Sequence, residues 1–199
     1  VPVLAVVDPK LMRTVPAQYT AYQGFDALFH NTEVMMSNGV NILSETLALS
    51  AIENIAKYLP RAVKDGNDLE ARERVAYGST IAGMTMQLTS TTAQHSMEHA
   101  MSAYHPNLPH GAGLVMISLE FARFFIERHA CDGQFIKMAR VMGMPEAEKA
   151  DTAGTAGKGR AAGDDAVRRA ASREAVPQPL PPDEAPPAVP EKAESSTAE

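Results

Sequence analysis

The chain has 199 residues, of which 45% are hydrophobic and 21% charged, and its formal net charge is −6. This length suits one domain with a hydrophobic core, whereas the acidic charge argues against a nucleic-acid binder that works through a broad basic face. A single cysteine, Cys131, excludes an internal disulfide framework and is typical of a reducing compartment such as the cytoplasm. No run of 18 apolar residues occurs, so we expect no membrane-spanning segment.

Two unlike parts follow one another along the chain. Residues 1–150 contain all six histidines, all eleven methionines and every aromatic residue, whereas residues 151–199 contain none of these and seven of the fourteen prolines. A segment with so few large apolar side chains cannot offset the entropy that it would lose on ordering. We therefore predict one folded domain over 1–150 and a low-complexity, mostly disordered tail over 151–199.

The first part opens with a short apolar run and then follows a helical period. Residues Val3 to Val7 predict one short N-terminal strand, and Pro16 can open a helical turn. A helix is predicted from about Gly24 to Met36. Another begins near Asn41, because apolar residues recur three or four positions apart as one buried face. These residues are Leu43, Leu47, Ala51, Ile52, Ile55 and Leu59.

The rest of the first part is also predicted to be helical. Pro60 is expected to bend the second helix, and Asp65 with Gly66 to end it. The run Asn67-Asp68-Leu69-Glu70 is typical of a capping box and predicts that a third helix follows. Further helices are predicted over 92–104, 111–128 and 132–142. The fold class is therefore all-α, a helical bundle with one short N-terminal strand.

Two clusters of polar residues carry the candidate chemistry. Asp26 and His30 are four residues apart, as are His95 and His99, and on a helix such pairs share one face. His110 lies at a loop-to-helix junction. A set of nitrogen and oxygen donors suits Fe(II) or Zn(II) better than Mg²⁺ or Ca²⁺, which prefer oxygen alone. Taken singly, each pair is more often a polar helix face than a metal site.

The other polar and sulfur-containing residues are given structural roles. We expect Glu33 and Glu98 to lie on helix surfaces, His105 to be a loop residue and His129 to lie near a helix C-terminus, where a cation is favoured. Cys131 is expected to be small and partly buried, without an activated thiol. Four methionines are expected to fill the core, and they are Met84, Met86, Met97 and Met101.

Four separated motifs follow one another in the first part. They are Thr20-Ala-Tyr-Gln-Gly24-Phe-Asp26-Ala-Leu-Phe-His30, Ala82-Gly83-Met84, His95-Ser-Met-Glu-His99-Ala-Met-Ser-Ala-Tyr and Leu108-Pro109-His110-Gly111. In this order they resemble the metal-binding domain of the iron-containing (group III) alcohol dehydrogenases, over roughly residues 1–150. The resemblance implies a helical bundle like the C-terminal domain of that family, which is dehydroquinate synthase-like.

The resemblance also implies a role for each residue of the two clusters. Asp26, His30, His95 and His110 correspond to the four metal ligands, and His99 to the catalytic histidine beside the reacting centre. The implied metal is Fe(II), with Zn(II) as the alternative. It would act as a Lewis acid on a small alcohol or aldehyde while NAD(P) exchanges the hydride, and His99 would relay the alcohol proton to solvent.

The same resemblance implies that a dinucleotide-binding domain precedes the matched region in family members. We find no substitute here, because the glycine-rich run Gly157 to Gly163 lacks the spacing and the preceding strand of a phosphate-binding turn. The chain is thus expected to be the catalytic-metal half of an oxidoreductase. Alternatively, it is an inactive truncated fragment that binds metal but not the nicotinamide cofactor. Alone, it is expected to bind Fe(II) or Zn(II) weakly at best and to leave alcohols unoxidised, while homo-oligomerisation stays open.

Overall fold

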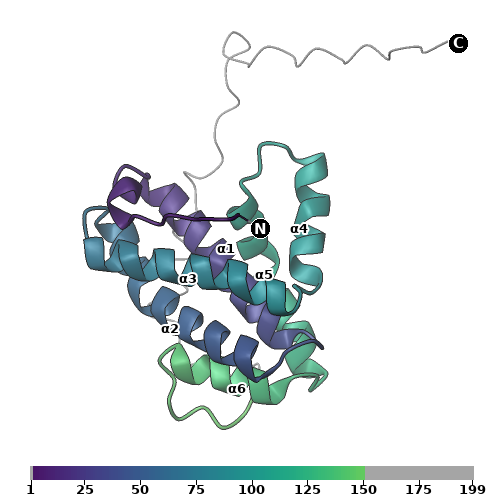
Figure 1. The fold of residues 1–199 in the computed structure, drawn as a ribbon. Helices are drawn as coiled ribbons and strands as arrows, with labels where there is room; N and C mark the ends of the chain where they lie inside the picture. Colours follow the sequence, from purple (N-terminus) through teal and green to yellow (C-terminus); the bar gives the residue numbers. More distant parts are fainter. Residues whose placement is uncertain (1, 151–199) are drawn as a thin grey trace, which may run out of the picture.

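The computed structural model describes residues 2–150, and within this range the regular structure is helical (Figure 1). The elements are a short 3-10 helix η1 (Pro9–Met12), then α1 (Ala17–Met36), α2 (Ile42–Lys64), α3 (Leu69–Leu88), α4 (Ala93–Tyr104), α5 (His110–Glu127) and α6 (Asp132–Val141). The all-α prediction is confirmed for these residues. The predicted tail over 151–199 and its glycine-rich run lie outside the described residues.

The first long helix begins earlier than predicted. Pro16 is the N-cap residue of α1, and its carbonyl oxygen accepts a hydrogen bond from the Thr20 amide at 2.9 Å. Gly24, expected near the start, instead lies inside α1, where the Leu59 side chain of α2 occupies the space that a Cβ would need. Gly24 therefore permits close packing of two helices and does not mark a helix end.

The second helix begins near Asn41, as predicted, and Asn41 is its N-cap residue. The Asn41 side chain accepts hydrogen bonds from the Leu43 and Ser44 amides, both at 3.1 Å, and the Ser44 hydroxyl receives the Asn41 amide in return. The helix continues through Pro60 and ends at Lys64, with Asp65 as its C-cap residue. The predicted end at Asp65-Gly66 is thus confirmed.

Two local predictions are wrong. Residues 2–8 form no strand, and Val3, Leu4 and Val6 are exposed, because a strand needs a pairing partner and residues 2–150 contain none. The capping box before α3 does not form either. Asp68, not Asn67, is the N-cap residue and accepts the Ala71 amide at 3.0 Å, while the Glu70 carboxylate pairs with Arg61 at 2.8 Å.

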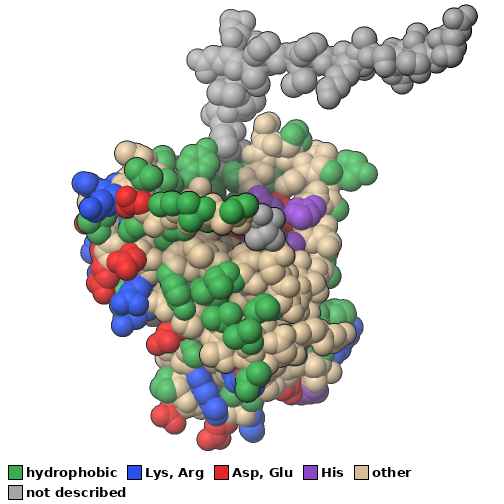
Figure 2. Space-filling view, in the orientation of Figure 1, with side chains coloured by type: hydrophobic (Ala, Val, Ile, Leu, Met, Phe, Trp, Pro, Cys, Tyr) green, Lys and Arg blue, Asp and Glu red, His purple; other side chains and the backbone are tan. Residues whose placement is uncertain are grey.

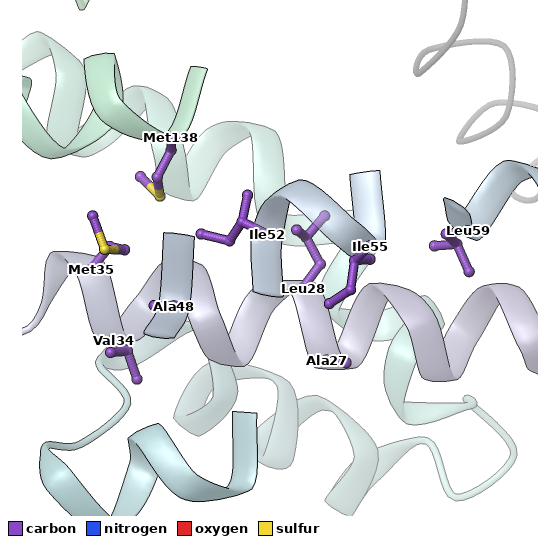
Figure 3. Close-up of a cluster of buried hydrophobic side chains, with 9 residues drawn as sticks. All are labelled: Ala27, Leu28, Val34, Met35, Ala48, Ile52, Ile55, Leu59 and Met138. Atoms are coloured by element: carbon purple, nitrogen blue, oxygen red, sulfur yellow. The ribbon is translucent and has the colours of Figure 1, made fainter. Parts of the chain in front are cut away.

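The main hydrophobic core lies between α1, α2 and α6 (Figure 3). Its buried members are Ala27, Leu28, Val34, Met35, Ala48, Ile52, Ile55, Leu59 and Met138. The buried face of α2 is shorter than predicted, because Leu43 is 54% exposed at the first turn. The prediction that all four methionines fill the core is also wrong, since Met84 and Met97 are about half exposed, at 52% and 48%.

The helices divide into a well-packed group and a more loosely attached helix. In Figure 1, α2 runs beside α3 and α6, and α4 stands apart at the edge; α5 packs against both α1 and α4. The buried residues of α4 are all polar: Gln94, His95 and Glu98. Hydrogen bonds, not apolar burial, therefore hold α4 against the fold. No helix among residues 2–150 has both the length and the apolar composition needed to cross a bilayer.

Two glycines of α3 allow a matched test of this packing. A Cβ on Gly78 would lie 2.5 Å from Cγ1 of Ile55, whereas a Cβ on Gly83 meets nothing within 4 Å. Overpacking costs about 1–3 kcal/mol, and the gain in helix propensity offsets only about 1 kcal/mol of it. We expect Gly78→Ala to lower the free energy of unfolding, and Gly83→Ala to raise it by roughly 0.5–1 kcal/mol. Urea titrations followed by circular dichroism measure both; equal stabilisation by the two changes would contradict this packing.

Candidate metal centre

Three imidazole rings surround one carboxylate oxygen. Oδ1 of Asp26 lies 3.2 Å from Nε2 of His95, 3.3 Å from Nε2 of His30 and 3.4 Å from Nε2 of His110. The rings of His30 and His95 stack, with their centroids 3.9 Å apart. The four residues that the sequence singles out as ligands are thus brought together from three helices. Figure 2 shows histidine side chains grouped on the face that carries α4.

The local sequence explains how each helix delivers its donor. Asp26 and His30 are one turn apart on α1 and so point the same way. His95 lies in the first turn of α4, and His110 is the first residue of α5. Gly111 lets α5 come close to α1, because a Cβ there would overlap the Tyr22 carbonyl oxygen and lie 2.9 Å from the Tyr22 Cα. This close approach sets His110 beside Asp26.

Glu33 joins α1 to the start of α4, and its predicted surface position is wrong. Its side chain is fully buried. Oε1 accepts the Thr92 and Gln94 amides, both at 2.9 Å, and the Thr92 hydroxyl at 2.6 Å, while Oε2 pairs with Nδ1 of His95. An acidic side chain from another helix therefore caps α4, and this position is also favoured by the helix dipole.

Glu98 is the second buried carboxylate, and its predicted surface position is equally wrong. It has no exposed surface, its Oε2 pairs with Nδ1 of His110, and its Oε1 accepts the Ser102 hydroxyl at 2.5 Å. The spacing of the two glutamates from the candidate ligands could have predicted their positions. Glu33 follows Asp26 by seven residues and Glu98 follows His95 by three, so each shares a helix face with a candidate ligand.

The charges of the centre depend on one another. Burial alone would lower the pKa of His95, but hydrogen bonds to the carboxylates of Asp26 and Glu33 outweigh it and raise that pKa to about 9. Burial raises the pKa of Asp26 and of Glu33, but the hydrogen bond from His95 and the nearby positive charges outweigh it, so both values fall. The pKa of His30 is lowered by burial and by the neighbouring His95. The carboxylates of Asp26 and Glu33 therefore favour a positive charge at His95.

The donor set suits a divalent transition metal. In His95 and His110, Nδ1 faces a buried carboxylate, which fixes the tautomer and leaves Nε2 free to bind a cation. His30 has no such carboxylate, and its buried Nδ1 has no partner among the described residues. Donor atoms of Asp26, His95 and His110 all lie within 4.8 Å of one another, as ligands of one ion would. Three imidazoles and one carboxylate are donors that Fe(II) and Zn(II) accept and that Mg²⁺ and Ca²⁺ disfavour.

The other histidines lie outside this group of four. His99 is exposed one turn beyond His95, and its ring centroid lies 5.4 Å from that of His110. It forms a second donor group with Glu98 and His110, apart from Asp26. His105 is the exposed C-cap residue of α4, and His129 pairs with Asp132 at 2.8 Å after the end of α5.

Comparison with known proteins identifies relatives that share this region. Residues 20–169 match the family model described as the Fe-containing alcohol dehydrogenase family, C-terminal. The chain is 38% identical over 110 residues, 55% of its length, to alcohol dehydrogenase 4 of Schizosaccharomyces pombe. It is 34% identical over 142 residues, 71% of its length, to 1,3-propanediol dehydrogenase of Klebsiella pneumoniae.

A solved structure also matches the fold. The sulfoacetaldehyde reductase of Bifidobacterium kashiwanohense, in complex with NAD⁺, superposes with a TM-score of 0.65 and 34% identity over 71% of this chain. The matched regions cover 26%, 36% and 37% of the yeast, Klebsiella and Bifidobacterium proteins. The chain therefore spans between about a quarter and little more than a third of the length of these relatives.

The approach of α5 to α1 can be tested at one glycine. We expect Gly111→Ala to push α5 away from Tyr22 and so to move His110 from Asp26. Removing the carboxylate behind a metal-bound imidazole already costs about 10–100-fold in metal affinity, and displacing the ligand should cost at least tenfold. Competitive Zn(II) titration measures the change. The control is Gly133→Ala in α6, where a Cβ meets nothing within 4 Å, and an unchanged affinity in Gly111→Ala would contradict this geometry.

Proposed function

This chain belongs to the iron-containing alcohol dehydrogenase family, and we propose that it supplies the metal-binding half of an enzyme that interconverts an alcohol and an aldehyde or ketone. The observation that supports the proposal most directly is the convergence of three Nε2 atoms on Oδ1 of Asp26. If Asp26 and His30 were only an exposed ion pair, the other two imidazoles would not converge on Asp26. Nor would Glu33 and Glu98 be buried against those imidazoles.

Asp26, His30, His95 and His110 are the residues that would hold the metal. A bound Fe(II) or Zn(II) would supply a Lewis acid for the oxygen of the substrate, and NAD(P) would be the partner in hydride transfer. The protein side chains orient the ligands. Glu33 and Glu98 keep the Nδ1 protons of His95 and His110 in place, so that both rings present Nε2 to the same point.

His99 is the residue that we assign to proton transfer. Its imidazole is exposed, so it reaches solvent, and it stacks near His110 with a centroid separation of 5.4 Å. It lies outside the four residues grouped around Asp26 and is therefore free to accept a proton from the substrate hydroxyl and pass it to water. A histidine is suited to this task because its ordinary pKa lies near neutrality.

The relatives indicate the class of substrate and cofactor. The yeast, Klebsiella and Bifidobacterium proteins are named for an alcohol, a diol and an aldehyde, and the last is bound to NAD⁺. We propose a small alcohol or aldehyde as substrate and NAD(P) as cofactor. The single free cysteine, Cys131, fits a protein that works in the reducing cytoplasm.

The activity should depend on a dinucleotide-binding domain, which residues 2–150 do not form. Positioning the nicotinamide against the substrate supplies about 7–11 kcal/mol of the barrier, and a metal site alone does not orient it. Loaded with Fe(II) under anaerobic conditions, the chain alone should form no NADH from short primary alcohols. The same chain fused behind the dinucleotide-binding domain of a family member should form it. Turnover by the chain alone within tenfold of a full-length family member would contradict this division of labour.

Two variants of the fusion separate metal binding from proton transfer. We expect His95→Gln to lose both the metal and the activity, because His95 is buried beside Asp26. We expect His99→Gln to keep the metal and to lose about 10²–10⁴-fold in turnover, the usual contribution of a positioned acid or base. Metal content by plasma mass spectrometry and NADH formation by absorbance measure the two effects. Loss of the metal in His99→Gln would assign His99 to the ligand set instead.

A further inference from the structure

Glu98 lies at a position where a surface helix would normally bury an apolar residue. It is completely buried in α4, and among the described residues its one ion-pair partner is His110. No lysine or arginine of the described chain approaches it. A buried carboxylate is unfavourable unless it is paired and hydrogen-bonded, so this arrangement depends on the His110 contact.

We propose that Glu98 is a positioning residue for the metal ligand His110, an inference that rests on the proposed metal centre. Oε2 of Glu98 accepts a hydrogen bond from Nδ1–H of His110, and this contact turns Nε2 of the same ring toward Oδ1 of Asp26, 3.4 Å away. The negative charge also makes Nε2 a stronger donor to a cation. Ser102, one turn further along α4, donates its hydroxyl to Oε1 and fixes the carboxylate in this orientation.

The helix that carries His110 also makes room for Glu98. Gly113 follows His110 by three residues, and a Cβ there would lie 2.6 Å from Oε1 and 2.9 Å from Cγ of Glu98. Even an alanine would therefore displace the carboxylate. The ligand and the space for its partner are both provided by the first turn of α5, so Glu98 and Gly113 act as one unit.

A Zn(II) titration of the full chain tests whether Glu98 positions His110 or only fills space in the interior. Glu98→Gln keeps the size of the side chain but removes its charge, and we expect the Zn(II) dissociation constant to rise about 10–100-fold. In ¹⁵N NMR spectra, the Nδ1–H signal of His110 should shift toward that of a weaker hydrogen bond. The control is Glu120→Gln, an exposed carboxylate on α5, which should change neither readout.

Gly113 provides an independent route to the same result. We expect Gly113→Ala to weaken Zn(II) binding about tenfold or more by displacing the Glu98 carboxylate, and to have little further effect when Glu98 is already alanine. Additive losses in the double variant would show that the two positions act separately and would overturn the proposal.

The outcomes distinguish the two levels of the inference. If the wild-type chain binds no Zn(II) either alone or fused behind the dinucleotide-binding domain of a family member, the metal centre itself is wrong. If the wild-type chain binds Zn(II) and Glu98→Gln binds it within twofold, with an unchanged His110 signal, the positioning role alone is wrong. Circular dichroism confirms that each variant is folded, and Glu98→Gln decides the matter should the alanine variant fail to fold.

Discussion

The convergence of three imidazoles on Oδ1 of Asp26 is the constraint on which the placement of α4 and α5 against α1 depends. Oδ1 lies 3.2–3.4 Å from each Nε2 atom, and an Nε2 lone pair that carries no proton repels the carboxylate oxygen. A proton or a metal ion on Nε2 removes this repulsion. The carboxylates of Asp26 and Glu33 favour a proton on His95 and raise its pKa to about 9, although burial opposes the shift. A divalent metal has to replace this proton, so binding and proton release are linked.

The molecule is held together in two ways. The helices α1, α2 and α6 share an apolar core around Met35, Ile52 and Met138. Helix α4 contributes no apolar residue to the buried interior. It is fixed by the cap from Glu33, by the hydrogen bond from Gln94 to the Leu114 carbonyl at 3.1 Å, and by its two carboxylate–histidine pairs. The placement of α4 is therefore coupled to the centre that it helps to build.

Much of the fold follows from local rules, and the exceptions have tertiary causes. The spacing of apolar residues places α2, α5 and α6 within a few residues, because the period of a helix is a local property. The i, i+4 pair Asp26–His30 is local in the same sense and leads directly to the centre. Glu33 and Glu98 look like ordinary surface acids, because their burial depends on which helices pack together and how closely. Gly111 and Gly113 allow that close packing, and only the assembled structure shows what they contact.

X-ray absorption at the zinc edge of the Zn(II)-loaded chain tests the central claim most directly. The structure predicts nitrogen and oxygen scatterers alone at about 2.0–2.2 Å, with the outer-sphere pattern of three imidazole rings. Replacing Asp26 by alanine should weaken Zn(II) binding. The Zn(II) that remains bound should still be coordinated by the same number of imidazoles. A sulfur scatterer near 2.3 Å would contradict the account, because it would place the metal at Cys131 or a methionine. So would a spectrum with fewer than three imidazoles, since the rings of His30, His95 and His110 would then not share one ion.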